Sequence, residues 1–291
     1  MTVEGNAAVI LNHNDNLNTL RLAKCFAGMS VIGKIAVVDN SGIHGLNGNE
    51  DELKNPKVEF VITENSGYAR GNNDAVHAIE AKFGLPEFLI ISNPDVEVSG
   101  ESIEQCVSFL TQNEKYAVAA PHNFRSDGKP HHLSGWKERT FLCDLAYSSG
   151  ILSRLIGMYR ETYPPSHWQT PYSIVDCVSG AFFLIRSAIF KEAGYFDEKT
   201  FLFYEEDILG YTLKRLGYKE AVLNTCSFIH FEGVSAGKNI NYIKKYCAMQ
   251  KSRLYFHRKY LKTGLLKMTL LYAATGLGFI ESLIKTVFKK Q

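Results

Sequence analysis

The sequence lacks the glycine-rich and nucleophile motifs that would assign it to several common enzyme classes. No G-x-G-x-x-G turn follows the first predicted strand, so a dinucleotide-binding Rossmann domain loses its main support. The run from Gly28 to Lys34 resembles a phosphate-binding P-loop, but Ile35 replaces the hydroxyl residue that would contact Mg²⁺, and the run precedes a strand. Ser179 has no G-x-S-x-G setting, which argues against an α/β-hydrolase.

Paired cysteines and targeting segments are missing as well. None of the 6 cysteines has CxxC spacing, and in a chain with a core of its own we expect reduced, mostly buried thiols. Residues 1–6 have neither the basic nor the apolar region of a secretory signal. We therefore expect a cytoplasmic protein. Its 291 residues, 45% of them apolar, suffice to bury the core of one large domain or two small ones.

What the sequence does contain is an alternation of short apolar runs with helical patterns. Near-continuous apolar strands separated by helices are typical of an α/β fold whose mainly parallel sheet is covered on both faces. The irregular stretch 122–170, rich in His, Trp and Tyr, indicates a long loop or small subdomain of a kind that is often functional. We expect strands at residues 7–11, 34–39, 58–63, 88–92, 116–121, 172–177 and 181–185, and helices at 17–27, 69–82, 101–111 and 206–216.

Three of the expected strands end in polar clusters, at residues 39–42, 64–67 and 93–95. A single cluster of this kind is ordinary turn chemistry. Ligands of parallel sheets bind beyond the carboxyl ends of the strands, so three clusters at one edge of one sheet favour a binding site there.

A series of short motifs follows in a fixed order over residues 7–235. They are residues 7–12, 37–41 (VVDNS), 65–73 (NSGYARGNN), 91–95 (ISNPD), 180–181 with Arg186, 194–198 (GYFDE), and 203–206 (FYEE) through 217–218 (GY). The ordered set resembles the family-2 glycosyltransferases of the GT-A fold, and among them the bacterial rhamnosyltransferase-like branch. The resemblance implies an inverting transfer of rhamnose or another hexose from a nucleotide-diphosphate donor to a lipid-linked or growing surface polysaccharide.

The resemblance also assigns donor and metal contacts to the strand ends. Asn93-Pro94-Asp95 matches the family's Asp-x-Asp motif, so that Asp95 would contact Mn²⁺ or Mg²⁺ and Asn93 the ribose or donor sugar. His230 matches a histidine that can complete the metal site, although a core or surface histidine is the simpler alternative. The remaining nucleotide-sugar contacts fall on Asn12, Asp39, Asn40, Arg70 and Asn73.

Glycosyl transfer also needs a general base that takes the proton of the acceptor hydroxyl. The acidic residues that begin the helix at 206–216 resemble the family's catalytic segment, and counting back from Gly217-Tyr218 puts the base at Glu206. A shift of one residue would make it Asp207 instead. Acids in a first helical turn also suit the helix dipole, and Ile208 replaces a family aspartate, so an inactive glycosyltransferase-like binding protein stays an alternative.

A second alternative is a sugar nucleotidyltransferase on a similar sheet. Such an enzyme needs a glycine-rich loop with Arg or Lys directly after the first strand. The sequence there is Asn12-His13-Asn14-Asp15, which argues against it.

The C-terminal residues are strongly basic, although the whole chain carries a net charge of only +2. From Lys238 onward the sequence contains twelve Lys and Arg residues and one acid, Glu281, which gives this tail a charge of about +11. The apolar stretch 268–280 is too short to span a bilayer but suits a helix that lies in the interface. We therefore expect a catalytic domain at 1–235 and a basic helical tail at 236–291 that binds the anionic inner face of the cell membrane, not nucleic acid. The alternative is a helix pair packed on the domain or on a second subunit in a homodimer.

Overall fold

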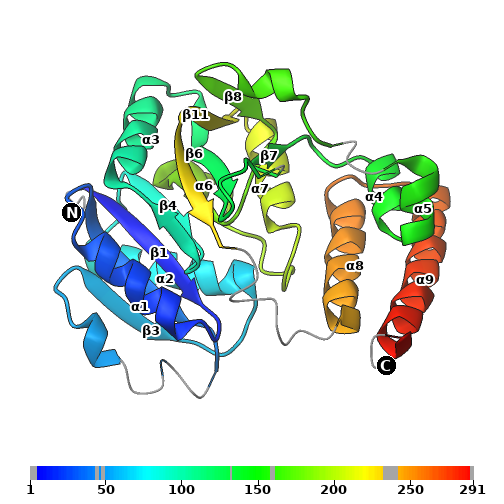
Figure 1. Cartoon of the computed structure of the whole chain (residues 1–291), viewed down its shortest axis with the longest axis horizontal. Coiled ribbons are helices and arrows are strands. Elements are labelled where there is room, and N and C mark those ends of the chain that lie inside the picture. Colours follow the sequence, from blue (N-terminus) through cyan, green and yellow to red (C-terminus); the bar gives the residue numbers. More distant parts are fainter. Residues whose placement is uncertain are drawn as a thin grey trace.

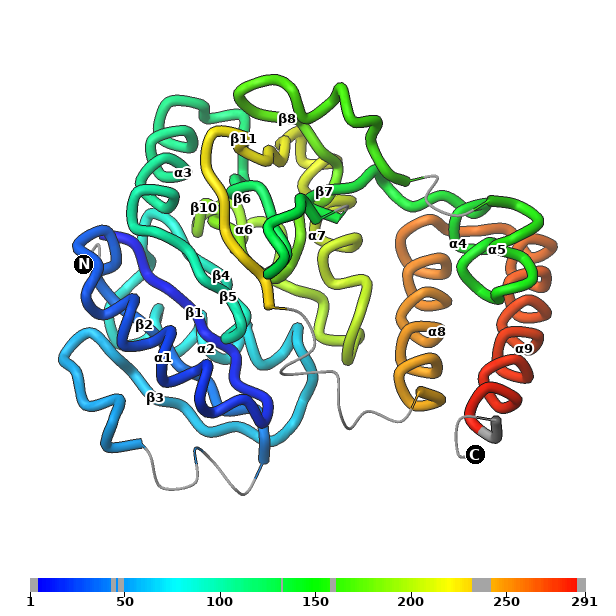
Figure 2. Tube along the Cα trace, viewed as in Figure 1, coloured from blue at the N-terminus to red at the C-terminus, as the bar shows by residue number. Residues whose placement is uncertain are grey.

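The structure is a computed structural model, and it describes residues 5–42, 46, 50–131, 133–157, 161–231 and 242–288. Figure 1 shows a central sheet with helices on both sides and a separate group of helices at one end of the molecule. That group consists of α4 (Phe141–Tyr147), α5 (Gly150–Ile156), α8 (Tyr242–Lys259) and α9 (Leu265–Phe288). The trace in Figure 2 places the N-terminus at the opposite end, beside the first strands of the sheet.

The larger sheet has the strand order β3-β2-β1-β4-β10-β6-β11-β5, and β8 also pairs with β11. Neighbouring strands are parallel from β3 to β4 and again between β6 and β11, whereas β10 runs antiparallel to both β4 and β6. The expected mixed, mainly parallel sheet is therefore confirmed. The strands are β1 (Asn6–Asn12), β2 (Ile32–Asp39), β3 (Val58–Ile62), β4 (Phe88–Ser92), β5 (Val96–Val98), β6 (Tyr116–Arg125), β8 (Tyr172–Val175), β10 (Phe182–Arg186) and β11 (Lys219–His230).

The central strands are apolar at nearly every position because both faces of the sheet are covered. Along β1, Ala8 and Ile10 pack into one core cluster, whereas Ala7, Val9 and Leu11 pack into the other. The first cluster lies under α1 (Asn16–Ala27) and α3 (Gly100–Gln112), and the second under α2 (Tyr68–Phe83), α6 (Ser187–Glu192) and α7 (Glu205–Arg215).

Two expectations from the sequence need correction in detail. The strand expected at 172–177 is interrupted, because β8 ends at Val175 and pairs with β11, whereas β9 (Cys177–Val178) pairs with β7 (Gly135–Trp136) in a second, two-stranded sheet. Of the two alternatives for the stretch 122–170, the long loop is wrong, since the stretch holds the end of β6, β7, α4, α5 and the short helix η2 (Pro165–Trp168).

The C-terminal residues form helices, as expected, and these helices pack on the rest of the chain. Tyr246 of α8 donates from its hydroxyl to the carbonyl oxygens of Ser148 and Thr275, both at 2.8 Å. Glu281 of α9 accepts from the backbone N–H groups of Gly150 and Ile151 at the start of α5, at 2.7 and 3.2 Å. No helix among the described residues is long and apolar enough to cross a membrane.

Gly278 marks the closest approach of α9 to α4, which gives a test of this packing. A Cβ atom at Gly278 would lie 1.9 Å from the carbonyl oxygen of Ser148, whereas one at Gly276 would meet nothing within 4 Å. Gly278→Ala should therefore lower the free energy of unfolding by about 1–3 kcal/mol through overpacking. Gly276→Ala in the same helix should raise it by roughly 0.5–1 kcal/mol, because alanine loses less backbone entropy.

Urea unfolding followed by circular dichroism measures both effects. Equal stability of the two variants would show that α9 does not pack against Ser148 as described.

Candidate active site

The carboxyl ends of β1 and β2 meet at a buried pair of polar side chains. Asn12 and Asp39 are register partners, and the Asn12 amide donates to Oδ1 of Asp39 at 3.0 Å. The side-chain Oδ1 of Asn12 accepts from the backbone N–H of Asp15 and from the hydroxyl of Thr19. The second carboxylate oxygen of Asp39, Oδ2, is buried and has no hydrogen-bond partner among the described residues. Asn12 therefore orients a carboxylate that keeps one acceptor for a ligand.

Asn40 fixes the next polar cluster to the end of β2. Its amide donates to the carbonyl of Gly67, and its own carbonyl oxygen accepts from the Ser66 backbone, at 3.0 and 2.9 Å. Gly67 has φ +92° and lies so close to Phe201 that a Cβ would fall 2.2 Å from its carbonyl oxygen. Arg70, in the first turn of the following helix α2, is exposed.

Asn73, like Asn12 and Asn40, has both atoms of its amide engaged within the protein. Its Nδ2 donates to the Phe196 carbonyl and to Glu198 at 2.9 and 3.1 Å, and its Oδ1 accepts from the Phe196 backbone at 3.1 Å. These contacts hold the loop that leads into the acidic segment before α7.

Asp95 and His230 converge, as the metal prediction requires. The two residues come together because β5 pairs with the end of β11, with His230 opposite Val96 and the Phe231 backbone bonded to the Asp95 carbonyl. Oδ1 of Asp95 lies 3.3 Å from Nε2 of His230. The described residues contain no group of three metal-binding side chains, so these two would need further ligands from a substrate. The backbone N–H of Asn93 donates to the carbonyl oxygen of Ala181, the residue before β10, at 2.8 Å.

The acidic segment at the start of α7 is held in a strained backbone. Phe203 and Tyr204 both have positive φ angles, 71° and 73°, which bulky residues rarely adopt. Strain of this kind persists where the surrounding packing enforces it, and it gathers at functional sites. Glu205 follows, and burial together with the charge of Glu206 holds the pKa of its carboxyl well above the ordinary value.

Glu206 lies against Gly180, two residues before the start of β10. A Cβ at position 180 would fall 2.1 Å from Oε1 of Glu206, so any larger residue there would displace the carboxylate from this position. The backbone N–H of Gly180 donates to this carboxylate, and its carbonyl accepts from the hydroxyl of Tyr68 at 2.7 Å. Burial raises the pKa of Glu206 to about 7, and the charge of Asp207 adds to the shift.

Asp207 has a different environment from its neighbour. It is 4% exposed, and its Oδ1 accepts from Nε1 of Trp136 at 2.8 Å and from Nε of Arg139 at 3.2 Å. Burial raises its pKa, against the opposing charge of Arg139. The two neighbouring acids therefore differ in their environments. Asp207 is buried and hydrogen-bonded to Trp136 and Arg139, whereas Glu206 remains partly exposed.

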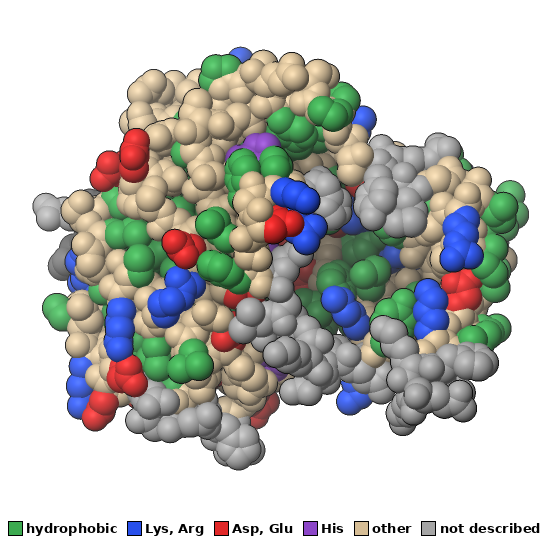
Figure 3. All heavy atoms as spheres, viewed as in Figure 1, with side chains coloured by type: hydrophobic (Ala, Val, Ile, Leu, Met, Phe, Trp, Pro, Cys, Tyr) green, Lys and Arg blue, Asp and Glu red, His purple; other side chains and the backbone are tan. Residues whose placement is uncertain are grey.

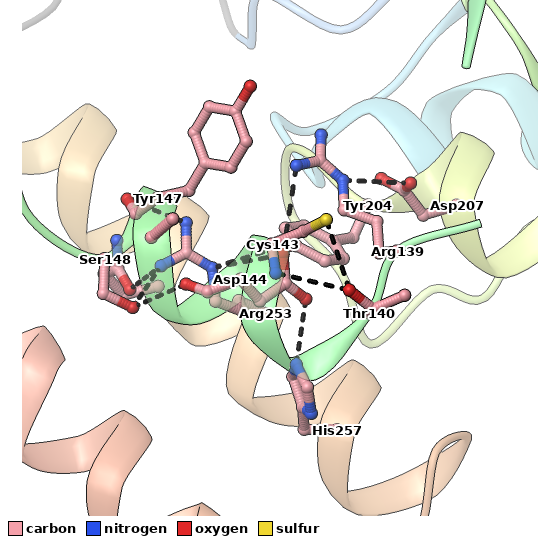
Figure 4. Close-up of polar contacts among 12 residues, drawn as sticks. Arg139, Thr140, Cys143, Asp144, Tyr147, Ser148, Tyr204, Asp207, Arg253 and His257 are labelled. Atoms are coloured by element: carbon pink, nitrogen blue, oxygen red, sulfur yellow. Dashed lines mark hydrogen bonds and ion pairs between the residues drawn. The ribbon is translucent and has the colours of Figure 1, made fainter. Parts of the chain in front are cut away.

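A buried network of polar side chains links Asp207 to the C-terminal helices (Figure 4). Arg139 lies between Asp207 and Asp144, which is a residue of α4. Its guanidinium is 3.2 Å from Oδ1 of Asp207 and 3.9 Å from Oδ1 of Asp144. The fully buried Asp144 accepts from Nε2 of His257 at 2.9 Å and from the hydroxyl of Tyr204 at 2.6 Å.

Arg253 of α8 completes this network. Its guanidinium is 3.9 Å from Asp144 and donates to the hydroxyls of Tyr204 and Ser148 at 3.0 and 2.8 Å. Burial alone would raise the pKa of Asp144, but the bond from His257 and the two arginine charges hold it below its ordinary value. Removal of one partner from such a pair typically costs roughly 3–5 kcal/mol, because a buried charge is left unpaired.

The acids, the strand-end residues and His230 are among the site residues predicted from the sequence, whereas the groups that hold them in position are not. Tyr68 lies within the 65–73 motif without having been singled out. The stretch 122–170, which was expected to be functional without a role for any one residue, contains Trp136, Arg139 and Asp144. Arg253 entered the prediction only as one of the basic residues of the tail. The signal available for the stretch 122–170 was its aromatic composition.

Comparison with known proteins finds several glycosyltransferases with sequences similar to this chain, although no family model matches it. The low-salt glycan biosynthesis hexosyltransferase Agl10 of Haloferax volcanii is 25% identical over 212 residues, which cover 71% of this chain and 61% of that protein. Rhamnosyltransferase WbbL of Escherichia coli strain K12 is 23% identical over 178 residues, covering 60% and 64%. The N-acetylglucosaminyl-diphospho-decaprenol L-rhamnosyltransferase of Mycobacterium tuberculosis is 22% identical over 200 residues, covering 63% and 62%. The matched part of the chain therefore spans about three fifths of the length of each of these relatives.

Solved structures show the same fold. The crystal structure of GalNAc-T7 with UDP, GalNAc and Mn²⁺ matches 87% of this chain and 47% of that chain, with a TM-score of 0.60 and 16% identity. The structure of Staphylococcus aureus TarS residues 1–349 matches 96% and 80%, with a TM-score of 0.53 and 14% identity. The sheet and its helices are those of the GT-A fold.

The raised pKa of Glu206 predicts a pH dependence of stability. The folded state holds the proton up to about pH 7, whereas an unfolded glutamate releases it near pH 4.3. Between these values the folded state binds more protons, so this group makes the protein less stable as the pH rises. Glu206→Gln should therefore gain stability relative to the wild type between pH 5 and pH 8.

Urea denaturation at the two pH values measures this difference. Glu114→Gln, which changes an exposed carboxyl on the turn before β6, should show the same difference from the wild type at both. A pH-independent difference for Glu206→Gln would contradict the shifted pKa.

Proposed function

We propose that this chain, a GT-A-fold protein of the family-2, rhamnosyltransferase-like kind, transfers a hexose from a nucleotide-diphosphate sugar to a saccharide acceptor with inversion. The observation that carries the proposal is Glu206, a partly exposed carboxylate with a pKa of about 7. It lies against Gly180, just before the start of β10, and the backbone N–H of Asn93 donates to the carbonyl of the next residue, Ala181. The names of the curated relatives, which include a rhamnosyltransferase for a diphospho-decaprenol acceptor, support a lipid-linked saccharide as the acceptor.

The donor would bind across the ends of β1, β2 and β4. Oδ2 of Asp39, which is buried and unpartnered among the described residues, suits an N–H group of the nucleobase. Arg70 is exposed at the start of α2, where its guanidinium is free to reach the diphosphate, and Asn93 would contact the ribose or sugar. In this proposal Asn40 and Asn73 act indirectly, because their amides hold the segments around Gly67 and Phe196.

Asp95 and His230 fit a divalent cation. A carboxylate oxygen and an imidazole nitrogen that lie 3.3 Å apart are suitable ligands for Mn²⁺ or Mg²⁺. Phosphate oxygens of the nucleotide sugar would supply further ligands. When bound there, a cation would offset the negative charge that develops on the leaving diphosphate.

Glu206 would act as the general base. As the acceptor oxygen attacks the anomeric carbon and the bond to the diphosphate breaks, the hydroxyl proton passes to the Glu206 carboxylate. A base works best when its pKa lies near the working pH, and burial sets this carboxyl at about 7. Asp207, held by Trp136 and Arg139, would keep the first turn of α7 in place.

The C-terminal helices supply a surface that suits attachment at the inner face of the cell membrane. One side of α9 carries exposed apolar residues at helical spacing, namely Leu266, Leu270, Ile280 and Ile284. The exposed fraction of Leu266 is 77%. Figure 3 shows hydrophobic side chains along the outer edge of this lobe, with Lys and Arg side chains beside them. An exposed apolar stripe with flanking cations is the pattern of a helix that lies on an anionic bilayer.

The base assignment predicts that Glu206→Gln keeps the fold and donor binding but loses activity. Loss of a positioned base typically lowers kcat by about 10²–10⁴-fold. Asp207→Asn should lower kcat less than about tenfold, because Asp207 takes no proton in this proposal and the asparagine oxygen can still accept from Trp136. The lost charge opposite Arg139 should instead lower the free energy of unfolding. The assay is acceptor-dependent release of nucleotide, with a panel of nucleotide sugars, a polyprenyl-diphosphate saccharide and Mn²⁺.

Thermal shift with nucleoside diphosphate and Mn²⁺ serves as the control for folding and donor binding. An inactive Asp207→Asn beside an active Glu206→Gln would move the base by one residue. Full activity of both variants would mean that the acidic segment is structural, and no transfer by any form would favour a binding protein.

Membrane attachment predicts that Leu266→Gln with Ile280→Gln weakens sedimentation with vesicles that contain anionic lipid. Both side chains are exposed, at 77% and 55%, so the fold should be preserved. The matched control is Leu17→Gln, which changes an 85% exposed leucine on α1 and should sediment like the wild type. If the double variant binds vesicles unchanged but loses a dimer seen by light scattering, the surface is a subunit interface.

A further inference from the structure

A hollow of about 580 Å³ lies beside the end of β6, apart from the acids and strand ends described above. Its walls come from β6, from the turn that follows it, and from the segment around η2. Figure 3 shows a histidine side chain among hydrophobic ones in a recess below the lobe that carries β8. The principal lining residues are His122, Pro130, His131, Tyr163 and Trp168.

The hollow is built mainly of aromatic rings. Trp168 is half-buried, and its ring centroid is 5.2 Å from that of His122 and 6.0 Å from that of Tyr163. Both rings meet the indole at steep angles, 63° and 86°, so neither lies parallel to it. His167 stacks flat on Tyr163 at 4.0 Å and makes that side of the hollow rigid. An indole presented in this way suits the flat apolar face of a small ring.

The polar groups of the hollow are neutral hydrogen-bonding groups. Nδ1 of the buried His122 bonds to Asn224 at 2.9 Å, and burial lowers the pKa of this imidazole, which is therefore uncharged at pH 7. Nδ1 of His131 accepts from the Leu133 backbone at 3.1 Å, which places the proton of a neutral ring on Nε2. The described lining contains no Lys, Arg, Asp or Glu.

A single segment of the chain connects this hollow to the acidic cluster. Ser134 accepts from the backbone N–H of Ser179, the residue before Gly180, at 3.2 Å. Two residues further, Trp136 donates to Asp207. His131 precedes Ser134 by three residues, which span at most about 11 Å of chain. The hollow is thus within a few sugar units of Glu206.

We propose that this hollow binds a pyranose unit of the acceptor saccharide, one or more residues away from the hydroxyl that reacts. The proposal rests on the proposed glycosyl transfer and extends it to acceptor choice. A pyranose has an apolar face for Trp168 and a rim of hydroxyls for the two imidazoles. An uncharged lining does not suit the diphosphate of the acceptor, and two buried, polar imidazoles do not suit a hydrocarbon chain.

Trp168→Leu tests the proposal, with Tyr172→Leu as the control. Tyr172 is an aromatic residue of the same lobe, but its ring packs against Phe109 and Tyr116 outside the hollow. Loss of an aromatic contact residue commonly weakens binding by about tenfold or more. In Trp168→Leu we therefore expect the KM for a lipid-linked saccharide to rise about tenfold, with kcat and the donor KM nearly unchanged. Tyr172→Leu should leave all three constants unchanged.

A binding measurement keeps the test independent of catalysis. Saturation-transfer NMR with methyl glycosides of rhamnose, glucose and N-acetylglucosamine should show contact with the wild type and with Glu206→Gln but not with Trp168→Leu. Glycoside contact with Glu206→Gln, even without transfer by any form, would support the hollow and count against the proposed reaction alone. Unchanged binding by Trp168→Leu, no glycoside binding by the wild type, or Trp168-dependent binding of a short polyprenyl phosphate only would each overturn the proposal.

Discussion

The buried carboxylate of Asp144 is the constraint on which the arrangement of the two ends of the molecule depends. A charge removed from water must be compensated, and here the partners come from three separate parts of the chain. His257 and Arg253 come from α8, Tyr204 from the start of α7, and Arg139 from the segment before α4. Because Arg139 also binds Asp207, the compensation of one charge fixes the C-terminal helices relative to the acidic cluster. The C-terminal helices, of which α9 carries the exposed apolar stripe, are thereby tied to the part of the molecule that holds the acidic cluster.

The strained turn before α7 depends on the same contacts. Tyr204 has a left-handed backbone conformation, and its buried hydroxyl is held between Asp144 and Arg253. The turn places two acids side by side with different surroundings. Asp207 is pulled into contacts with Trp136 and Arg139, whereas Glu206 is packed against Gly180 and remains partly exposed. Difference in surroundings, and not in chemistry, separates the two carboxylates.

The site therefore divides into two sides that the chain builds in different ways. The proposed donor side uses the ends of strands of the larger sheet, where Asn12, Asp39 and Asp95 lie. The proposed acceptor side, with Trp136 and the aromatic hollow, is built mainly from the stretch 122–170. In folds of this kind the sheet supplies a common scaffold, and the connecting segments supply the specific contacts.

The sequence by itself determined the sheet, most of its strands and the residues at their ends. Apolar runs of the required length are local patterns, and polar residues at their ends follow from the same local reading. Only the tertiary structure decided which distant groups meet. His230 reaches Asp95 through the antiparallel pairing of β5 with β11, and Asn73 is turned to the Phe196 loop. In the sequence Arg253 is one of many basic residues of the tail, and only the structure shows it as a buried partner of Asp144. These outcomes depend on packing between segments far apart in the chain, which no local pattern of residues encodes.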